Sequence, residues 1–300
     1  MRNSFIQDLV AEAEQNKNIV LLTGDLGNNC LELFWNRFPD RFFNCGIAEQ
    51  NMMLLAAGLA MEGKKVFVYS IGNFNSLRVL EMIRNDLSYM NLDVNIISCG
   101  AGLEYGKLGF SHHSTEDISA LRCLPNVSVF SPATVKEMRG VTRYMLDSTN
   151  PCFVRLNKKS TGDFGSQALR VSEIVKGEHA AILATGSIVT EAIEAAKMLY
   201  TNGVRVSVFS CPVIKPRADR AIKDIISKFN TIVTLEEHTV VGGFGSSVAE
   251  LVAESGKGVR FKMLGIQDEY APLVGDRGHL RKQYKMDAES VAKTIIKLLK

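Results

Sequence analysis

The sequence of 300 residues carries little net charge and has no apolar run long enough to cross a membrane. Its 35 Lys and Arg residues nearly balance 32 Asp and Glu residues, so the formal net charge is only +3. Such a balance does not favour nucleic acid or an anionic membrane as the main partner. The longest uncharged apolar-rich stretch near the N-terminus, 51–61, is shorter than the ~20 residues that a spanning helix needs. We therefore predict no nucleic-acid partner and no membrane partner.

Motifs for structural metals and redox dithiols are also absent. None of the six cysteines are spaced as CxxC, which argues against a zinc ribbon or a thioredoxin-type site, and there is no HExxH. The cysteines lie mostly in apolar runs, where a free thiol behaves as a small buried hydrophobe. Gln7 and Asp8 stand where a signal peptide needs its apolar core. We expect reduced cysteines, no metal ligands in this chain and a cytoplasmic location.

The sequence lacks the common nucleotide-binding fingerprints. Neither GxGxxG after the first predicted strand nor GxxxxGK[ST] occurs, which argues against a nucleotide-binding α/β protein. The run Gly242-Gly243-Phe244-Gly245-Ser246 follows a predicted strand and opens a predicted helix. A phosphate is one interpretation, since helix N-termini attract anions. A tight turn that needs glycine is the simpler one.

Short apolar runs alternate with segments of helical periodicity along the whole chain. Predicted strands lie at 19–23, 41–45, 66–69, 94–98, 127–130 and 152–156, with helices at 48–61, 77–90 and 135–146. The helix 48–61 is apolar on nearly all sides, so we expect it to be buried. After a polar segment, 157–177, the alternation restarts, with strands at 180–184, 204–209, 232–235 and 259–264 and helices at 189–200, 222–229, 244–253 and 288–299. The pattern predicts an α/β protein of two domains, 1–160 and 178–300, each a mainly parallel sheet covered by helices.

Glu49 is a candidate functional carboxylate. It starts the apolar helix 48–61, and a carboxylate near a helix N-terminus is favoured by the helix dipole. If the helix is buried, that charge is costly without a specific partner. The residue alone leaves a structural and a functional role equally open.

His112 and His113 are two of only five histidines and follow a loop that contains Gly100, Gly102 and Gly109. A loop after a strand lies at the edge where open α/β sheets bind ligands, and histidine titrates near neutral pH. We favour a role in proton transfer over a pair satisfied by the nearby Glu116 and Asp117.

Taken together, these segments resemble the C-terminal half of transketolase, over essentially the whole chain. The resemblance rests on 43–52 (FNCGIAEQNM), Ile83-Arg84-Asn85-Asp86, Ser111-His112 with Glu116-Asp117, Ile214-Lys215-Pro216, and 235–238 (LEEH) through 242–245 (GGFG). It implies a pyrimidine-binding domain for thiamine diphosphate, followed by a C-terminal domain that usually supports dimerisation rather than chemistry.

The resemblance also implies roles for the candidate residues at the cofactor. Glu49 would hydrogen-bond the ring nitrogen of the cofactor's pyrimidine, where burial strengthens the bond. Phe74 would stack on that ring, and Ile71 would lie against it.

Further residues are implied to meet the sugar substrate. His112 and His113 would contact its hydroxyl groups, with His112 moving protons. Arg155 would pair with a substrate phosphate or other anion, and Asp25 would line the same crevice.

One domain of the family is missing from this sequence. The family binds the cofactor's diphosphate and Mg²⁺ through a Gly-Asp-Gly motif and a downstream Asn, and the nearest approach here is Gly24-Asp25-Leu26. The resemblance therefore implies a split enzyme that transfers a two-carbon ketol unit from a ketose to an aldose. A diphosphate-binding subunit would hold most of the Mg²⁺ site, in a heterotetramer built on a dimer of this chain.

Departures from the family pattern leave the substrate open. Leu108 stands in place of a family aspartate, Gly100 in place of a histidine and His113 in place of a glutamine. Two alternatives remain: transfer from pyruvate, as in deoxyxylulose-phosphate synthase, and a non-catalytic scaffold subunit. The joint presence of Glu49, Phe74 and His112 argues against the scaffold.

Overall fold

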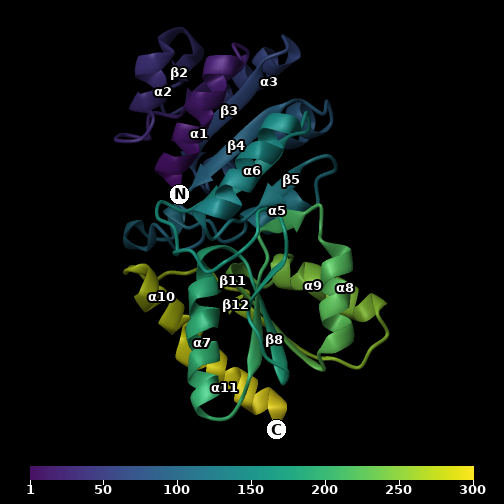
Figure 1. The fold of residues 1–300 in the computed structure, drawn as a ribbon. Coiled ribbons are helices and arrows are strands. Elements are labelled where there is room, and N and C mark those ends of the chain that lie inside the picture. Colours follow the sequence, from purple (N-terminus) through teal and green to yellow (C-terminus); the bar gives the residue numbers. More distant parts are fainter.

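A computed structural model describes residues 1–300 as two sheets stacked end to end, each covered by helices on both faces (Figure 1). The first sheet has seven strands in the order β10-β5-β6-β4-β3-β1-β2. Its strands are β1 (Ile19–Thr23), β2 (Phe42–Asn44), β3 (Lys65–Ile71), β4 (Val94–Cys99), β5 (Ser128–Phe130), β6 (Cys152–Leu156) and β10 (Val213–Lys215). All of its neighbouring pairs are parallel except β10 with β5. Strands β1, β4 and β6 are buried along their full length, which explains their unbroken apolar character.

The second sheet has five strands in the order β12-β11-β8-β9-β7. They are β7 (Ser172–Val175), β8 (Ala180–Ala184), β9 (Val206–Ser210), β11 (Thr231–Thr239) and β12 (Arg260–Ile266). Only β7, at one edge, is antiparallel to its neighbour. The predicted fold class, two helix-covered and mainly parallel sheets, is confirmed.

Helices divide the interior into three apolar clusters. Helices α1 (Arg2–Gln15), α2 (Glu32–Arg37) and α6 (Val135–Asp147) contribute to a cluster on one face of the first sheet. Helices α7 (Val189–Thr201) and α11 (Ala288–Leu299) do so on the second sheet. The remaining faces share one cluster, to which α3 (Glu49–Met61), α5 (Asp117–Arg122), α8 (Asp219–Lys228) and α9 (Phe244–Glu254) contribute. The two sheets are therefore joined through a common core.

The segment after β3 is irregular where the sequence predicts one helix over 77–90. A 3₁₀ turn at Leu77–Val79 leads into α4 (Leu80–Met82) and then a π-helical stretch at Ile83–Ser88. Such wide turns occur often at functional sites. Here they follow the loop that carries Phe74, and Arg78 lies in the 3₁₀ turn itself.

Helix α3 is less buried than predicted. Met52, Met53, Ala56 and Ala57 pack inward, but Leu54, Leu55 and Met61 are exposed, as is Ile47 just before the helix. The expectation of full burial is wrong for the chain by itself, because no element of this chain covers the outer face of the helix.

Polar contacts also fix the two sheets to each other. His238 of β11 accepts hydrogen bonds at Nε2 from the backbone N–H groups of Ile118 and Ser119 on α5. Burial lowers the pKa of His238 to about 4, so the ring is neutral. At Gly102, with φ of +60°, a Cβ would lie 2.6 Å from the Glu237 side chain. Loop 100–113 therefore packs directly on the second domain, and glycine permits that approach.

No disulfide forms, and all six cysteines are free. No helix combines the length and the apolar character that a membrane crossing requires. No group of three or more His, Cys, Asp or Glu side chains is placed to hold a metal ion.

Candidate functional site

The candidate residues gather at one edge of the first sheet, at the carboxyl ends of its parallel strands. Phe74 follows β3, and His112 and His113 follow β4. Glu49 begins α3 in the connection between β2 and β3. Parallel strands place these connections side by side, which is why residues far apart in the sequence meet here.

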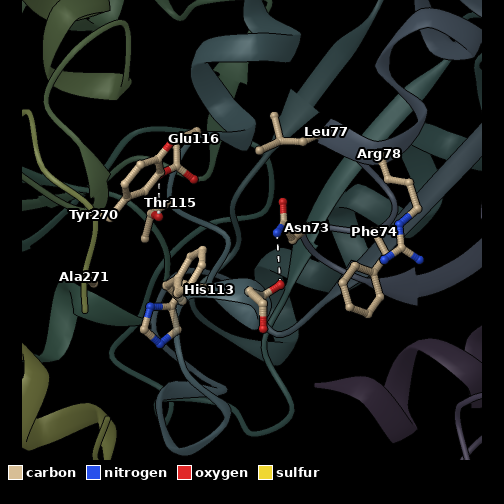
Figure 2. A pocket seen from close by; sticks show the side chains of 11 residues that line it. Asn73, Phe74, Leu77, Arg78, His113, Thr115, Glu116, Tyr270 and Ala271 are labelled. Atoms are coloured by element: carbon tan, nitrogen blue, oxygen red, sulfur yellow. Dashed lines mark hydrogen bonds between the residues drawn. The ribbon is translucent and has the colours of Figure 1, made fainter. Parts of the chain in front are cut away.

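Arg78 links the Glu49 carboxylate to the Phe74 ring. Its carboxylate is only 2% exposed, and Oε2 accepts a hydrogen bond of 2.6 Å from Arg78 Nη1. The guanidinium carbon of Arg78 lies 4.1 Å from the centroid of the Phe74 ring. Figure 2 shows the Arg78 guanidinium beside that ring. The buried carboxylate thus has its charged partner, and that partner also covers the aromatic face.

The surroundings of Glu49 fit an aminopyrimidine. Gly24 has no side chain, and a Cβ there would contact Glu49 Oε1 at 3.4 Å and Ser70 Oγ at 3.5 Å. Ser70 Oγ is buried and has no hydrogen-bond partner. An unpaired hydroxyl and a buried carboxylate on one wall suit a ring that offers both donors and acceptors. The half-buried Phe74 ring supplies an apolar surface for stacking.

The two histidines have different surroundings. The His112 ring is half-buried and lies 5.3 Å from the Phe74 ring, centroid to centroid, with Nδ1 3.0 Å from Ser111 Oγ. His113 is buried, and neither of its ring nitrogens has a hydrogen-bond partner. Burial lowers the pKa of His113, so its imidazole is neutral at pH 7. A neutral, unpaired imidazole can both donate to and accept from a ligand.

A cavity of about 600 Å³ lies between Phe74, Arg78 and His113 and the second domain (Figure 2), while Glu49 and His112 are not among its lining residues. Phe74 and Arg78 line one side of it, and Tyr270 and Ala271 from the loop after β12 line another. The remaining lining residues are Asn73, Leu77, Phe110, Ser111, His113, Thr115 and Glu116. Burial raises the pKa of Glu116. A half-apolar cavity with a few converging polar groups has the character of a small-molecule site.

Asp25 and Ile71 support the site from outside the cavity. The Asp25 side chain is exposed, and it exchanges hydrogen bonds with Asn44: Asn44 Nδ2 donates to Asp25 Oδ1 at 2.9 Å, and Asp25 N donates to Asn44 Oδ1 at 3.0 Å. This pair shapes the loop before Glu49. The carbonyl of Ile71 accepts from the backbone N–H groups of Phe74 and Asn75, which forms the turn that presents Phe74.

Arg155 does not face the cavity. It is 2% exposed, and Nε donates to Asp117 Oδ2 at 2.8 Å while Nη2 donates to the carbonyls of Ser114 and Glu237. These interior contacts give the buried cation a structural role, and they lend no support to the predicted contact with a substrate anion. The exposed cations just beyond this strand are Lys158 and Lys159, and Lys158 Nζ lies 4.1 Å from the centroid of the Tyr105 ring.

The glycine-rich turn before α9 already holds an internal carboxylate. Glu236, fully buried, accepts from the backbone N–H groups of Phe244 and Gly245, each at 2.7 Å. Burial raises the pKa of Glu236 to about 7. Because these donors are occupied, the tight-turn interpretation of Gly242–Ser246 stands and the phosphate interpretation does not.

Two residues that line the cavity could not be predicted from the sequence. Arg78 reads as a helix-surface charge, since nothing in its neighbourhood indicates a partner 29 positions earlier. Tyr270 lies in the second domain, 157 positions after His113. Arg277, on α10 (Arg277–Gln283), ties that domain to loop 100–113 through Glu104 (2.9 Å) and the carbonyl of Ala101 (3.2 Å).

Comparison with known proteins identifies the family of this chain. Residues 1–163 match the family described as transketolase, pyrimidine binding domain, and residues 169–291 match transketolase, C-terminal domain. The chain belongs to the transketolase family. The resemblance drawn from the sequence is thereby confirmed, and membership implies a thiamine-diphosphate-dependent transferase.

Relatives of similar length within the transketolase family are themselves described as parts of an enzyme. A putative transketolase C-terminal section of Methanocaldococcus jannaschii is 36% identical over 100% of this chain and 96% of its own length. One of the apulose-4-phosphate transketolase subunits of Phocaeicola vulgatus is 33% identical over 100% of this chain and 97% of its own length. A solved structure described as a split gene transketolase, inactive beta4 tetramer, superposes with a TM-score of 0.88 at 32% identity, over 99% of this chain and 97% of that one.

Proposed function

We propose that this chain is one subunit of a split transketolase-like enzyme that transfers a two-carbon ketol unit from a ketose donor to an aldose acceptor. The observation that supports it most is the contact of Glu49 with Arg78 beside Phe74, at the same sheet edge as the His112-His113 loop. Thiamine diphosphate, when bound, supplies the chemistry that breaks and forms the carbon–carbon bonds.

Each residue of the site has a defined task in this proposal. Glu49 would hydrogen-bond the pyrimidine ring nitrogen, in a place sheltered from water. Phe74 would stack on the ring, and Ile71 holds the turn that carries Phe74. His112 and His113 bind and exchange protons with the substrate's hydroxyl groups.

The partner subunit is the second part of the proposal. A diphosphate-binding subunit holds the cofactor's diphosphate and Mg²⁺ and covers the exposed apolar side of α3, in a heterotetramer built on a dimer of this chain. We place the complex in the cytoplasm, which agrees with six free cysteines.

Calorimetry tests this proposal. Thiamine diphosphate with Mg²⁺ is titrated into this chain, and then into its mixture with the subunit that carries a Gly-Asp-Gly motif. Binding in the mixture alone is the expected result. A comparison of ketose with pyruvate as donor then separates ketol transfer from deoxyxylulose-phosphate-synthase-like transfer. No binding in either sample contradicts the cofactor role and favours a scaffold subunit.

A further inference from the structure

Arg78 has few contacts, although it pairs with a buried carboxylate. Its side chain is 42% exposed and makes one hydrogen bond, to Glu49 Oε2. Arg155 gives the contrast within the same fold, because its buried guanidinium makes three hydrogen bonds. Arg78 also borders the cavity of about 600 Å³, which gives the side chain room to move.

The guanidinium of Arg78 has the shape and bonding of the ligand proposed for this site. It is a planar group in which N–H donors flank a carbon, it lies 4.1 Å from the Phe74 ring centroid, and it donates to Glu49. Arg78 takes Oε2 of the carboxylate and one face of the Phe74 ring. An aminopyrimidine that stacks on this face and bonds to Oε2 would need both of the contacts that Arg78 makes.

We propose that Arg78 lies where the aminopyrimidine would bind and is displaced when the cofactor binds. This inference rests on the proposed function. Arg78 pairs with the buried charge of Glu49 and covers the Phe74 ring. The cofactor must break the ion pair and the stacking contact before it makes its own, so Arg78 competes with it for the site.

The first test compares cofactor affinity in the complex of this chain with its diphosphate-binding subunit. Arg78→Met removes the competing charge and plane and keeps much of the side-chain volume. The expected result is binding of thiamine diphosphate with Mg²⁺ about three- to ten-fold tighter than in wild type, measured by calorimetry. Unchanged or weaker binding overturns the inference. If neither protein binds the cofactor, the proposed function fails and the inference with it.

Matched variants separate displacement from general effects on the fold. Arg84→Met lies on the same segment and removes an exposed arginine whose hydrogen bond is to Asn85, so its affinity should equal that of wild type. Arg78→Lys keeps the charge beside Glu49 without a planar group, and its affinity should lie between wild type and Arg78→Met. It also serves if Arg78→Met does not fold.

A crystal structure of the loaded complex gives a readout independent of affinity. Displacement predicts that Arg78 Nη1 lies beyond hydrogen-bonding distance of Glu49. Retention of the 2.6 Å contact with the cofactor in place excludes displacement.

Discussion

Glu49 and its two neighbours show how a single buried charge is accommodated. The carboxylate is 2% exposed and makes an ion pair with Arg78, which in turn lies on Phe74. Glu49→Gln keeps the shape and removes the charge. We expect turnover to fall by at least about 100-fold, because proton transfer by a positioned side chain is worth about 10²–10⁴.

The Glu49→Gln experiment measures ketol transfer by the assembled complex at saturating cofactor. Circular dichroism and the thermal midpoint serve as controls and should match wild type. Full activity in this variant would refute the role assigned to Glu49.

The resemblance to transketolase indicated Glu49 and Phe74, whereas residue type and position left their roles open and could not rank the cations. Arg155 follows apolar residues in a predicted strand and Arg78 lies in the predicted helix 77–90, so Arg155 reads as the site residue. The structure shows Arg155 bound inside the domain joint and Arg78 at the cavity. Which cation finds an internal carboxylate depends on contacts between distant segments, and sequence spacing does not report these.

Among the elements, α10 holds loop 100–113 in place. Arg277 donates to Glu237, Glu104 and the carbonyl of Ala101. We expect Arg277→Met to lower the free energy of unfolding by about 2–3 kcal/mol, since buried ion pairs are costly to break from one side and this one is partly exposed. Because loop 100–113 loses its tether, KM for the acceptor sugar should also rise.

Urea unfolding and acceptor titrations check the Arg277→Met prediction. Lys282→Met on the same helix is the matched control, because Lys282 is exposed and should change unfolding by less than about 0.5 kcal/mol. Equal effects of the two substitutions would show that α10 is not a tether.

The outer face of α3 is the second element with a predicted consequence. Leu54, 48% exposed, stands among the apolar residues that no part of this chain covers. We expect Leu54→Gln to weaken association with the diphosphate-binding subunit by about ten-fold or more, as apolar residues at interface centres often do. The chain's own unfolding should stay within about 0.5 kcal/mol of wild type.

Sedimentation of mixtures at several concentrations measures the effect of Leu54→Gln. Met198→Gln is the control, since Met198 is an exposed apolar residue on α7 of the second domain. An unchanged association constant for Leu54→Gln would place the partner elsewhere.

Elements with a strong apolar pattern could be predicted from the sequence. Short edge strands that depend on pairing with a neighbouring strand could not. The predicted strands 19–23, 152–156 and 180–184 agree with β1, β6 and β8. Strand β7 lies inside the segment 157–177 that reads as a polar linker, and β10 has only three residues. Both are edge strands that exist because a neighbouring strand offers hydrogen-bonding groups, which the local sequence does not reveal.

For the whole molecule, the joint between the domains contains two buried groups with opposite responses to acid. Burial lowers the pKa of His238 to about 4, so between about pH 6.5 and 4 the unfolded chain binds a proton that the folded chain does not. Burial raises the pKa of Glu236 to about 7, so between about pH 4.5 and 7 the folded chain binds the extra proton. Acid thus destabilises through His238 and stabilises through Glu236, and the two effects oppose each other from about pH 4.5 to 6.5.

Glu236→Gln removes one side of this balance. We expect its stability to fall as the pH decreases from 6.5 to 4.5, while that of wild type changes less over the same range. Urea midpoints at three pH values in this range provide the measurement. A variant whose stability does not decrease on acidification would show that His238 does not govern the joint.

The antiparallel pairing of β10 with β5 has a consequence for how the molecule can be divided. Val213–Lys215 come from the second half of the chain yet complete the sheet of the first half. A fragment that stops in the segment 157–177 would leave the edge of β5 bare, ready to recruit a strand from another molecule. A chimera joined at that point with half of a related enzyme would therefore pair β5 with a strand from the other enzyme. Active chimeras should keep residues 213–215 together with the first half of the same chain.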